Sequence, residues 1–262
     1  MRDTATANKT AGRQKARLLA IFSVCLGLLA FAWGVSVLPE LLRALPLHRV
    51  SVRIIQGYTF STGDLDALRP ELDRIERQSA SCHIALRSTA VIRLAIAERS
   101  IADANRDRID NDKEALRTAV RAALACTPTD AYLWLVLFWI ENDQNGFQER
   151  NLEFLKLSYD YGPNEGWIAL KRNPLALGIY AQLPPALQQL SLNEFAGLLR
   201  SGFISQTVDT LIGPAWPIHD KLLASIANQP ERQRYLMAND LYRRGYDVIV
   251  PGIKAREARP WR

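Results

Sequence analysis

The sequence predicts an all-α protein in which one N-terminal membrane-spanning helix precedes a helical domain. An uncharged apolar run near the N-terminus indicates the spanning helix. Apolar residues that recur every three or four positions, separated by short polar turns, indicate helices over most of the remainder. The predicted organisation, in chain order, is a basic tail at 1–17, a membrane anchor at 18–38, a juxtamembrane helical segment at 39–79, paired helices at 80–182, a helical C-terminal cap at 183–253 and a charged tail at 254–262.

The predicted anchor, residues 18–38, has no charged side chain in 21 positions. As a helix it spans about 30 Å, the thickness of the hydrocarbon core of a bilayer. The competing interpretation is a signal peptide cleaved after Ala32, because residues 30–32 form a small-residue cleavage site. The apolar run continues to Leu38, which is longer than cleavage requires, so we favour a retained anchor.

Charge predicts the orientation of this helix and argues against nucleic acid as a partner. Five basic residues precede it within 1–17, against Asp3 alone, so the positive-inside rule keeps the N-terminus in the cytoplasm. In a Gram-negative bacterium the helix would then lie in the inner membrane and the body in the periplasm. The sequence pI is near 9.4, but the excess of positive charge lies in the two tails and leaves the body close to neutral.

The juxtamembrane stretch at 41–56 is interpreted as helix rather than as a short strand, because Gly57 follows it like a helix C-cap. Ser61 then begins a helix that is expected to run to about Gln78. Its apolar residues fall on one face, namely Leu65, Leu68, Leu72 and Ile75.

Between 80 and 182 the periodicity predicts paired antiparallel helices. A polar turn at 106–111 and a break at 127–130 separate the first three. The expected helices are 81–105, 112–126, the nearly all-apolar 131–141, a fourth around Leu152 to Leu157 that ends near Gly162, and a fifth that begins at Trp167.

Pro128 and Pro163 lie 35 residues apart, and each closes one helix and precedes an aromatic-bearing one. This spacing is typical of a helical repeat, and the segment resembles tetratricopeptide repeats. The matching residues are Ala104, Ala119, Ala123 and Pro128 in one unit and Trp134, Leu137, Leu155, Ser158 and Pro163 in the next. Phe138 and Glu141 depart from the family pattern, and an irregular helical bundle is the alternative.

The C-terminal cap is expected to contain shorter helices. One opens at Pro184 and Pro185, Ser191 caps another, residues 213–217 break the chain, and a helix that begins at Pro230 ends at Gly245. The β-branched residues Val248, Ile249 and Val250 are expected to form a short strand.

Cys82 and Cys126 are the two cysteines of the body, and an oxidising compartment favours a disulfide between them. The predicted helices leave a mismatch of about 9 Å between the two positions, which a bend or a later helix start would close. Two separately buried thiols are the alternative. Cys25 lies in the predicted anchor.

The sequence offers no nucleophile motif, phosphate loop or metal-ligand spacing, so we expect no enzyme activity, no cofactor and no metal. Aromatic and basic residues on neighbouring helices are instead the candidates for binding a protein partner: Tyr132, Trp134, Trp139, Trp167, Lys171 and Arg172. Core packing and a solvated helix face are the alternatives for these residues.

The leading hypothesis is therefore a membrane-anchored, non-enzymatic scaffold or adaptor that binds a protein partner in the cell envelope, as an accessory of polysaccharide or secretion machinery. The alternative is a helical cell-wall hydrolase. That hypothesis requires a buried carboxylate in a cleft, for which Glu165 beside Trp167 is the candidate.

Overall fold

The computed structural model describes residues 3–77, 82, 84–104 and 106–254, and for residues 3–21, 37, 39, 40 and 43 it describes the backbone alone. Regular secondary structure over these residues is entirely helical, which confirms the predicted all-α class. The chain divides into an N-terminal unit, Met1–Ala95, and a C-terminal unit, Ile96–Arg262.

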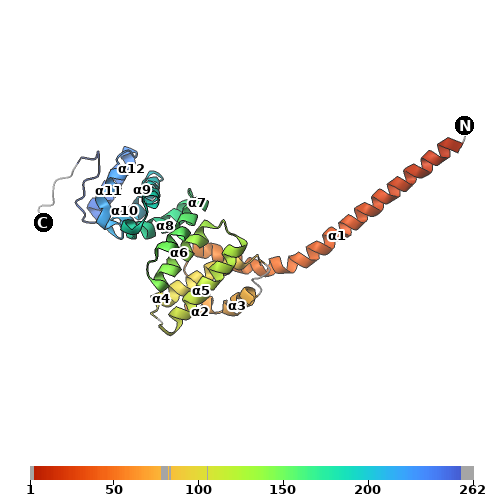
Figure 1. The fold of residues 1–262 in the computed structure, drawn as a ribbon, viewed down its shortest axis with the longest axis horizontal. Helices are drawn as coiled ribbons and strands as arrows, with labels where there is room; N and C mark the ends of the chain where they lie inside the picture. The colour runs from red at the N-terminus through yellow and green to blue at the C-terminus, as the bar shows by residue number, and fades with distance from the viewer. Residues whose placement is uncertain (1–2, 78–81, 83, 105, 255–262) are drawn as a thin grey trace. The chain divides into compact units, whose positions relative to one another are not determined.

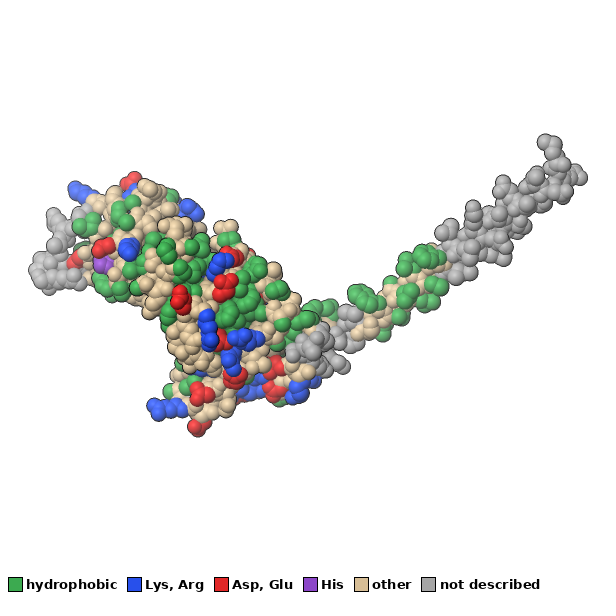
Figure 2. All heavy atoms as spheres, in the orientation of Figure 1, with side chains coloured by type: hydrophobic (Ala, Val, Ile, Leu, Met, Phe, Trp, Pro, Cys, Tyr) green, Lys and Arg blue, Asp and Glu red, His purple; other side chains and the backbone are tan. Residues whose placement is uncertain are grey.

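Helix α1, Asp3–Ile55, is the longest element and includes the predicted anchor (Figure 1). It continues through Pro39, beyond the C-terminal end of the predicted anchor at Leu38. Its described apolar side chains between Phe22 and Leu38 are exposed, and they form the green surface of this helix in Figure 2. Among the described residues, no helix combines the length and the apolar character that crossing a membrane requires.

The last turns of α1 pack into the N-terminal unit. Ala44, Leu47 and Ser51 recur at helical spacing and are buried. The hydroxyl of Ser51 donates a hydrogen bond to that of Ser88, at 3.2 Å. Gly57 follows the helix with φ +88°, a conformation that glycine adopts without a Cβ clash. The prediction of helix over 41–56 is therefore confirmed.

The expected helix after Ser61 is two helices, α2 (Thr62–Asp66) and α3 (Arg69–Arg77). Ser61 caps α2 as predicted, because its hydroxyl accepts the Asp64 amide hydrogen and the Asp64 carboxylate accepts the Ser61 amide hydrogen. Pro70 explains the break: proline has no amide hydrogen for an intrahelical bond but is tolerated in a first helical turn. Predicted core residues Leu65, Leu72 and Ile75 are buried, and Gln78 lies outside the described residues.

Helix α4 covers Leu86–Ala102 and α5 covers Arg106–Cys126. The predicted polar turn at 106–111 is wrong, because α5 already begins at Arg106. Charged residues suit an exposed first turn, and Asp107 there interacts favourably with the helix dipole. Asp112, where the helix was expected to begin, is buried within it instead.

Helices α5, α6 (Ala131–Asn145) and α7 (Leu152–Tyr161) pack in sequence, and α6 also contacts α8 (Gly166–Gly178). The Asp130 carboxylate caps α6 by accepting the amide hydrogens of Tyr132 and Leu133, each at 3.1 Å. An ion pair between Arg121 and Glu141, at 2.6 Å, joins α5 to α6. The 3-10 helix η2 (Glu149–Asn151) precedes α7.

Four further helices build a second core in the C-terminal unit (Figure 1): α9 (Pro185–Arg200), α10 (Ile204–Ile212), α11 (His219–Ser225) and α12 (Glu231–Arg243), with 3-10 turns η3 (Tyr180–Gln182) and η4 (Trp216–Ile218). The buried residues at their centre include Phe195, Leu199, Leu211, Leu222 and Leu241.

Two predictions for this region are wrong. Ser191 does not start a helix, because it lies buried in the middle of α9 and its hydroxyl donates to the Gln188 carbonyl oxygen. Residues 248–250 form no strand, since no neighbouring strand exists in the described part of the chain for them to pair with. Most of the predicted charged tail, 255–262, lies outside the described residues.

Candidate functional site

The aromatic residues predicted to bind a partner fall into two groups, which lie on different sides of α6. Tyr132 is buried, and its ring centroid lies 4.9 Å from that of Trp167 on α8. Trp139 follows Tyr132 by seven residues, about two turns, so it lies on the same side of α6, where it is half-buried. Tyr132 and Trp167 therefore contribute to the packing between α6 and α8.

The second group lies on another side of α6. Trp134 is half-buried and stacks on Phe154 of α7, with ring centroids 5.8 Å apart and ring planes 17° apart. Its indole nitrogen donates a hydrogen bond to the Pro128 carbonyl oxygen at 2.7 Å, which fixes the ring at the start of the helix. An aromatic pair that is held in place and partly exposed is a suitable anchor for another protein.

Glu165, the candidate acid of the hydrolase alternative, is the N-cap residue of α8 and is exposed. Its carboxylate accepts a hydrogen bond from the Trp167 indole at 3.1 Å and makes no capping bond to the helix. A general acid in a glycosidase relies on burial in an apolar site. The exposure of Glu165 does not provide that environment.

Arg172 does not face a partner, contrary to the sequence-based expectation, because its side chain is completely buried in α8. Its guanidinium donates to one carboxylate oxygen of Glu194 on α9, at 2.6 and 3.0 Å, and to the Ser158 hydroxyl at 3.1 Å. It also donates to the carbonyl oxygens of Ser158 and Gly162 and lies 4.0 Å over the Tyr159 ring. The group therefore joins α7, α8 and α9 and is occupied within the fold.

We call Arg172, Glu194, Tyr159, Ser158 and Asn173 the Arg172 cluster. The Tyr159 hydroxyl and the Asn173 amide donate to the second Glu194 oxygen, at 3.1 and 3.4 Å. Burial raises the pKa of Glu194, although Arg172 and these donors oppose the effect. Burial, together with the Glu194 charge, also raises the pKa of Tyr159 well above its usual value.

Lys171, the neighbouring candidate, is exposed on α8. The pKa of the Glu98 carboxyl is raised, because desolvation raises it by more than the nearby charge of Lys171 lowers it. An anionic partner at Lys171 would therefore have to compete with Glu98.

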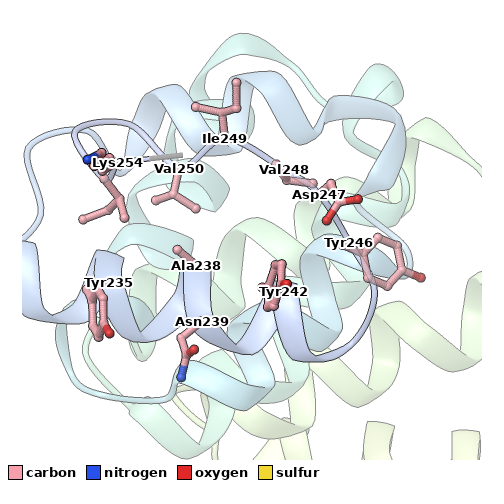
Figure 3. Close-up of a pocket in the computed structure, with 11 residues that line it drawn as sticks. Tyr235, Ala238, Asn239, Tyr242, Tyr246, Asp247, Val248, Ile249, Val250 and Lys254 are labelled. Atoms are coloured by element: carbon pink, nitrogen blue, oxygen red, sulfur yellow. The ribbon is translucent and has the colours of Figure 1, made fainter. Parts of the chain in front are cut away.

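A cavity that the sequence did not predict lies between α12 and the segment 246–254 (Figure 3). It has a volume of about 230 Å³ and is lined by three tyrosines, Tyr235, Tyr242 and Tyr246, among other residues. Val250 is buried against α12, whereas Ile249 projects away from it and is exposed. The β-branched run that suggested a strand is thus the outer wall of this cavity.

Arg234 holds the cavity wall in place. Its guanidinium donates to the carbonyl oxygen of Gln229, at 2.9 Å, and to that of Pro251. Gly252 follows with φ +71°, and a Cβ at this position would collide with the Arg234 guanidinium. A glycine is therefore required where the segment turns past α12.

The cysteines differ in their chemical state. Cys82 and Cys126 are each disulfide-bonded, and Cys25 is free and exposed on α1. The later helix start that the bridge needed is present, because α4 begins at Leu86 rather than at residue 81.

The described residues contain no group of three or more histidine, cysteine, aspartate or glutamate side chains placed to hold a metal ion. The features that remain for function are the exposed apolar surface of α1, the Trp134–Phe154 pair and the tyrosine-lined cavity. Each presents apolar or aromatic surface, which is suited to binding. No family model, no curated protein and no solved structure matches the chain.

Proposed function

We propose that the chain is a membrane-anchored, non-enzymatic helical scaffold that binds a protein partner in the cell envelope. The observation that carries this proposal is the exposure of the apolar side chains of α1 between Phe22 and Leu38. Leu29, Phe31 and Trp33 are each about 70% exposed. A continuous exposed apolar surface of this kind is unfavourable in water and marks a site of contact with lipid or protein.

Lipid is the better explanation, because residues 18–38 lack charge and lie within one helix. A helix satisfies its own backbone hydrogen bonds, as the interior of a bilayer requires. The same helix continues past Ala32 to buried Ala44 and Leu47, which favours a retained anchor over a cleaved signal. The basic residues at 1–17 then place the N-terminus in the cytoplasm and the folded units in the periplasm of a Gram-negative cell.

The partner-binding role is proposed for the helix pairs of the C-terminal unit. The successive packing of α5, α6 and α7 supports a tetratricopeptide-like repeat, whose surfaces hold peptides or proteins. The stacked Trp134 and Phe154 supply an aromatic anchor on this surface. By analogy with other anchored helical-repeat proteins, the partner would belong to polysaccharide or secretion machinery.

Alkaline carbonate extraction tests the anchor. We expect the full chain to stay in the membrane pellet and a variant with Leu28→Glu and Leu29→Glu to be released, because charge at the bilayer centre is costly. A control with Leu28→Val and Leu29→Val should stay in the pellet. Release of the unaltered chain would contradict the proposal.

Photo-crosslinking in intact cells tests the partner. A photoreactive amino acid at Trp134 or Phe154 should capture one discrete protein, whereas the same residue at exposed Asp220 should not. Identical products at all three positions, or no product at the first two, would contradict a partner at this surface.

A further inference from the structure

The last third of α1 has two different faces. Leu41, Leu45, Arg49 and Arg53 follow one another at four-residue spacing and are all exposed. Ala44, Leu47 and Ser51, which pack into the N-terminal unit, lie on roughly the opposite side of the helix. The four exposed residues therefore point away from the packed side of the helix.

This exposed face changes character along the helix. Leu41 and Leu45, with Leu42 beside them, continue the apolar surface of the proposed anchor beyond Leu38. Two arginines, Arg49 and Arg53, follow on the same face, and neither has a partner within the described residues. Apolar side chains followed by unpaired cationic ones match the depth profile of a bilayer, from acyl chains to phosphates.

The length of the helix places this face at the level of the lipid headgroups. At a rise of 1.5 Å per residue, Leu45 lies about 10 Å beyond Leu38 and Arg49 about 16 Å beyond it. The headgroup layer is roughly 5–8 Å thick, and the attraction of anionic lipid for cations extends about 10 Å farther in physiological salt. Leu41 and Leu42 would thus lie in the headgroup layer, Leu45 at its outer edge, and Arg49 within the range over which the lipid phosphates attract a cation.

We infer that Leu41, Leu42, Leu45, Arg49 and Arg53 form a contact with the surface of an anionic phospholipid bilayer and hold the N-terminal unit against it. The inference rests on the proposed anchor. The leucines lie in and at the outer edge of the headgroup layer, and the two guanidinium groups lie outside it, where the negative potential of the lipid phosphates attracts them.

Fluorescence quenching in vesicles tests the contact. The full chain, with Cys25→Ser, is reconstituted in phosphatidylcholine vesicles that contain phosphatidylglycerol. An environment-sensitive dye is attached to a single cysteine placed at Leu28, Leu42, Leu45 or the exposed control Asp220. We expect a nitroxide deep in the acyl chains to quench the dye at position 28. A nitroxide on the lipid headgroup should quench the dyes at 42 and 45, and neither should quench the dye at 220.

The outcomes separate this inference from the anchor. Deep quenching at 28 with no headgroup quenching at 42 and 45 overturns the surface contact and leaves the anchor intact. Absence of deep quenching at 28 overturns the anchor and, with it, the contact. Protection of the dyes at 42 and 45 only at high protein-to-lipid ratios assigns this face to a second copy of the chain and also overturns the contact.

A charge variant tests the arginines. Each exposed arginine near an anionic surface contributes about 1 kcal/mol, which is about a fivefold change in equilibrium. Arg49→Gln with Arg53→Gln should therefore lower the ratio of docked to undocked protein by about 25-fold, seen as weaker headgroup quenching at 45. The matched control, Arg77→Gln with Arg232→Gln, removes two other exposed arginines and should leave the quenching unchanged. Equal quenching in both variants would overturn the role of lipid phosphate.

Discussion

Among the described residues, each unit of the molecule contains one buried arginine, and the two are stabilised in different ways. Arg93 in the N-terminal unit pairs with two carboxylates: Glu76 binds it through both oxygens, at 2.8 and 2.9 Å, and Asp73 binds it through one. Arg172 in the C-terminal unit pairs with Glu194 alone and obtains its other bonds from backbone carbonyls and a hydroxyl.

Solvent exposure, rather than the number of carboxylates, distinguishes the two sites. Glu76 and Asp73 are 20% and 50% exposed, so water can replace part of the stabilisation that either carboxylate gives to Arg93. Glu194 is 7% exposed and Arg172 is fully buried. Burial tends to lower the pKa of Arg93, but Glu76 and Asp73 outweigh it and the pKa is raised. The comparison indicates that the site shielded from water depends more strongly on its acidic partner.

The largest effect is expected from Glu194→Ala. It leaves the Arg172 guanidinium buried without a counter-charge, which should cost about 3–5 kcal/mol in the free energy of unfolding. Urea unfolding followed by tryptophan fluorescence measures the change. Glu194→Gln should cost less than Glu194→Ala but remain destabilising, because the amide oxygen can still accept from Arg172 while the buried guanidinium again lacks a counter-charge. A loss below about 1 kcal/mol for Glu194→Ala would remove the distinction between the two arginine sites.

Glu76→Ala should have a smaller effect, about 1.5–3 kcal/mol, since it removes two charge-assisted bonds but leaves Asp73 beside Arg93. Amide hydrogen exchange in α3 and α4 localises the loss to the N-terminal unit. An effect equal to that of Glu194→Ala would show that partial exposure does not protect the Arg93 site.

Tyr159→Phe tests how the stability of the Arg172 cluster depends on pH. At neutral pH it should cost about 1 kcal/mol, because one hydrogen bond to Glu194 is lost. The raised pKa of Tyr159 means that the folded protein keeps the phenol proton at a pH where the unfolded chain releases it. The contribution of Tyr159 to stability is therefore lost as the pH rises above about 10. The wild type should lose stability faster than Tyr159→Phe in that range, and parallel pH curves would contradict the assignment.

The smallest effect is expected from Asp73→Asn. Its carboxylate is half exposed, so its pair with Arg93 should contribute less than about 1 kcal/mol. Added salt should weaken this contribution and leave that of Glu194 nearly unchanged. A salt-dependent loss in Glu194→Ala would indicate that the Arg172 cluster is open to solvent.

Local signals in the sequence predicted much of the helical fold. Ser61 caps a helix as expected, and Gly57 and Gly245, which were expected at helix ends, follow them with positive φ. These signals act within a few residues, so the sequence displays them directly. The polar run that begins at Arg106 is ambiguous, because the same charged residues suit either a turn or the exposed first turn of a helix.

The Arg172 cluster could not be predicted from the sequence, because its residues are distant along the chain. Arg172 and Glu194 are 22 residues apart, and nothing near Arg172 in the sequence shows that three helices would enclose it. Arginine is rarely buried, so a surface role was the natural expectation. The tyrosine-lined cavity was missed in the same way, because its wall depends on the contact of Arg234 with the distant Pro251 carbonyl.

The uninterrupted helix α1 also sets an angular register. Each residue added to a helix rotates everything beyond it by about 100°. One alanine inserted between Leu38 and Leu41 would therefore turn the face that carries Leu45 and Arg49 sideways, with almost no change in length or composition. Seven added residues would nearly restore its direction while lifting it about 10 Å. The orientation of the N-terminal unit toward the bilayer would thus be encoded in the number of residues between them.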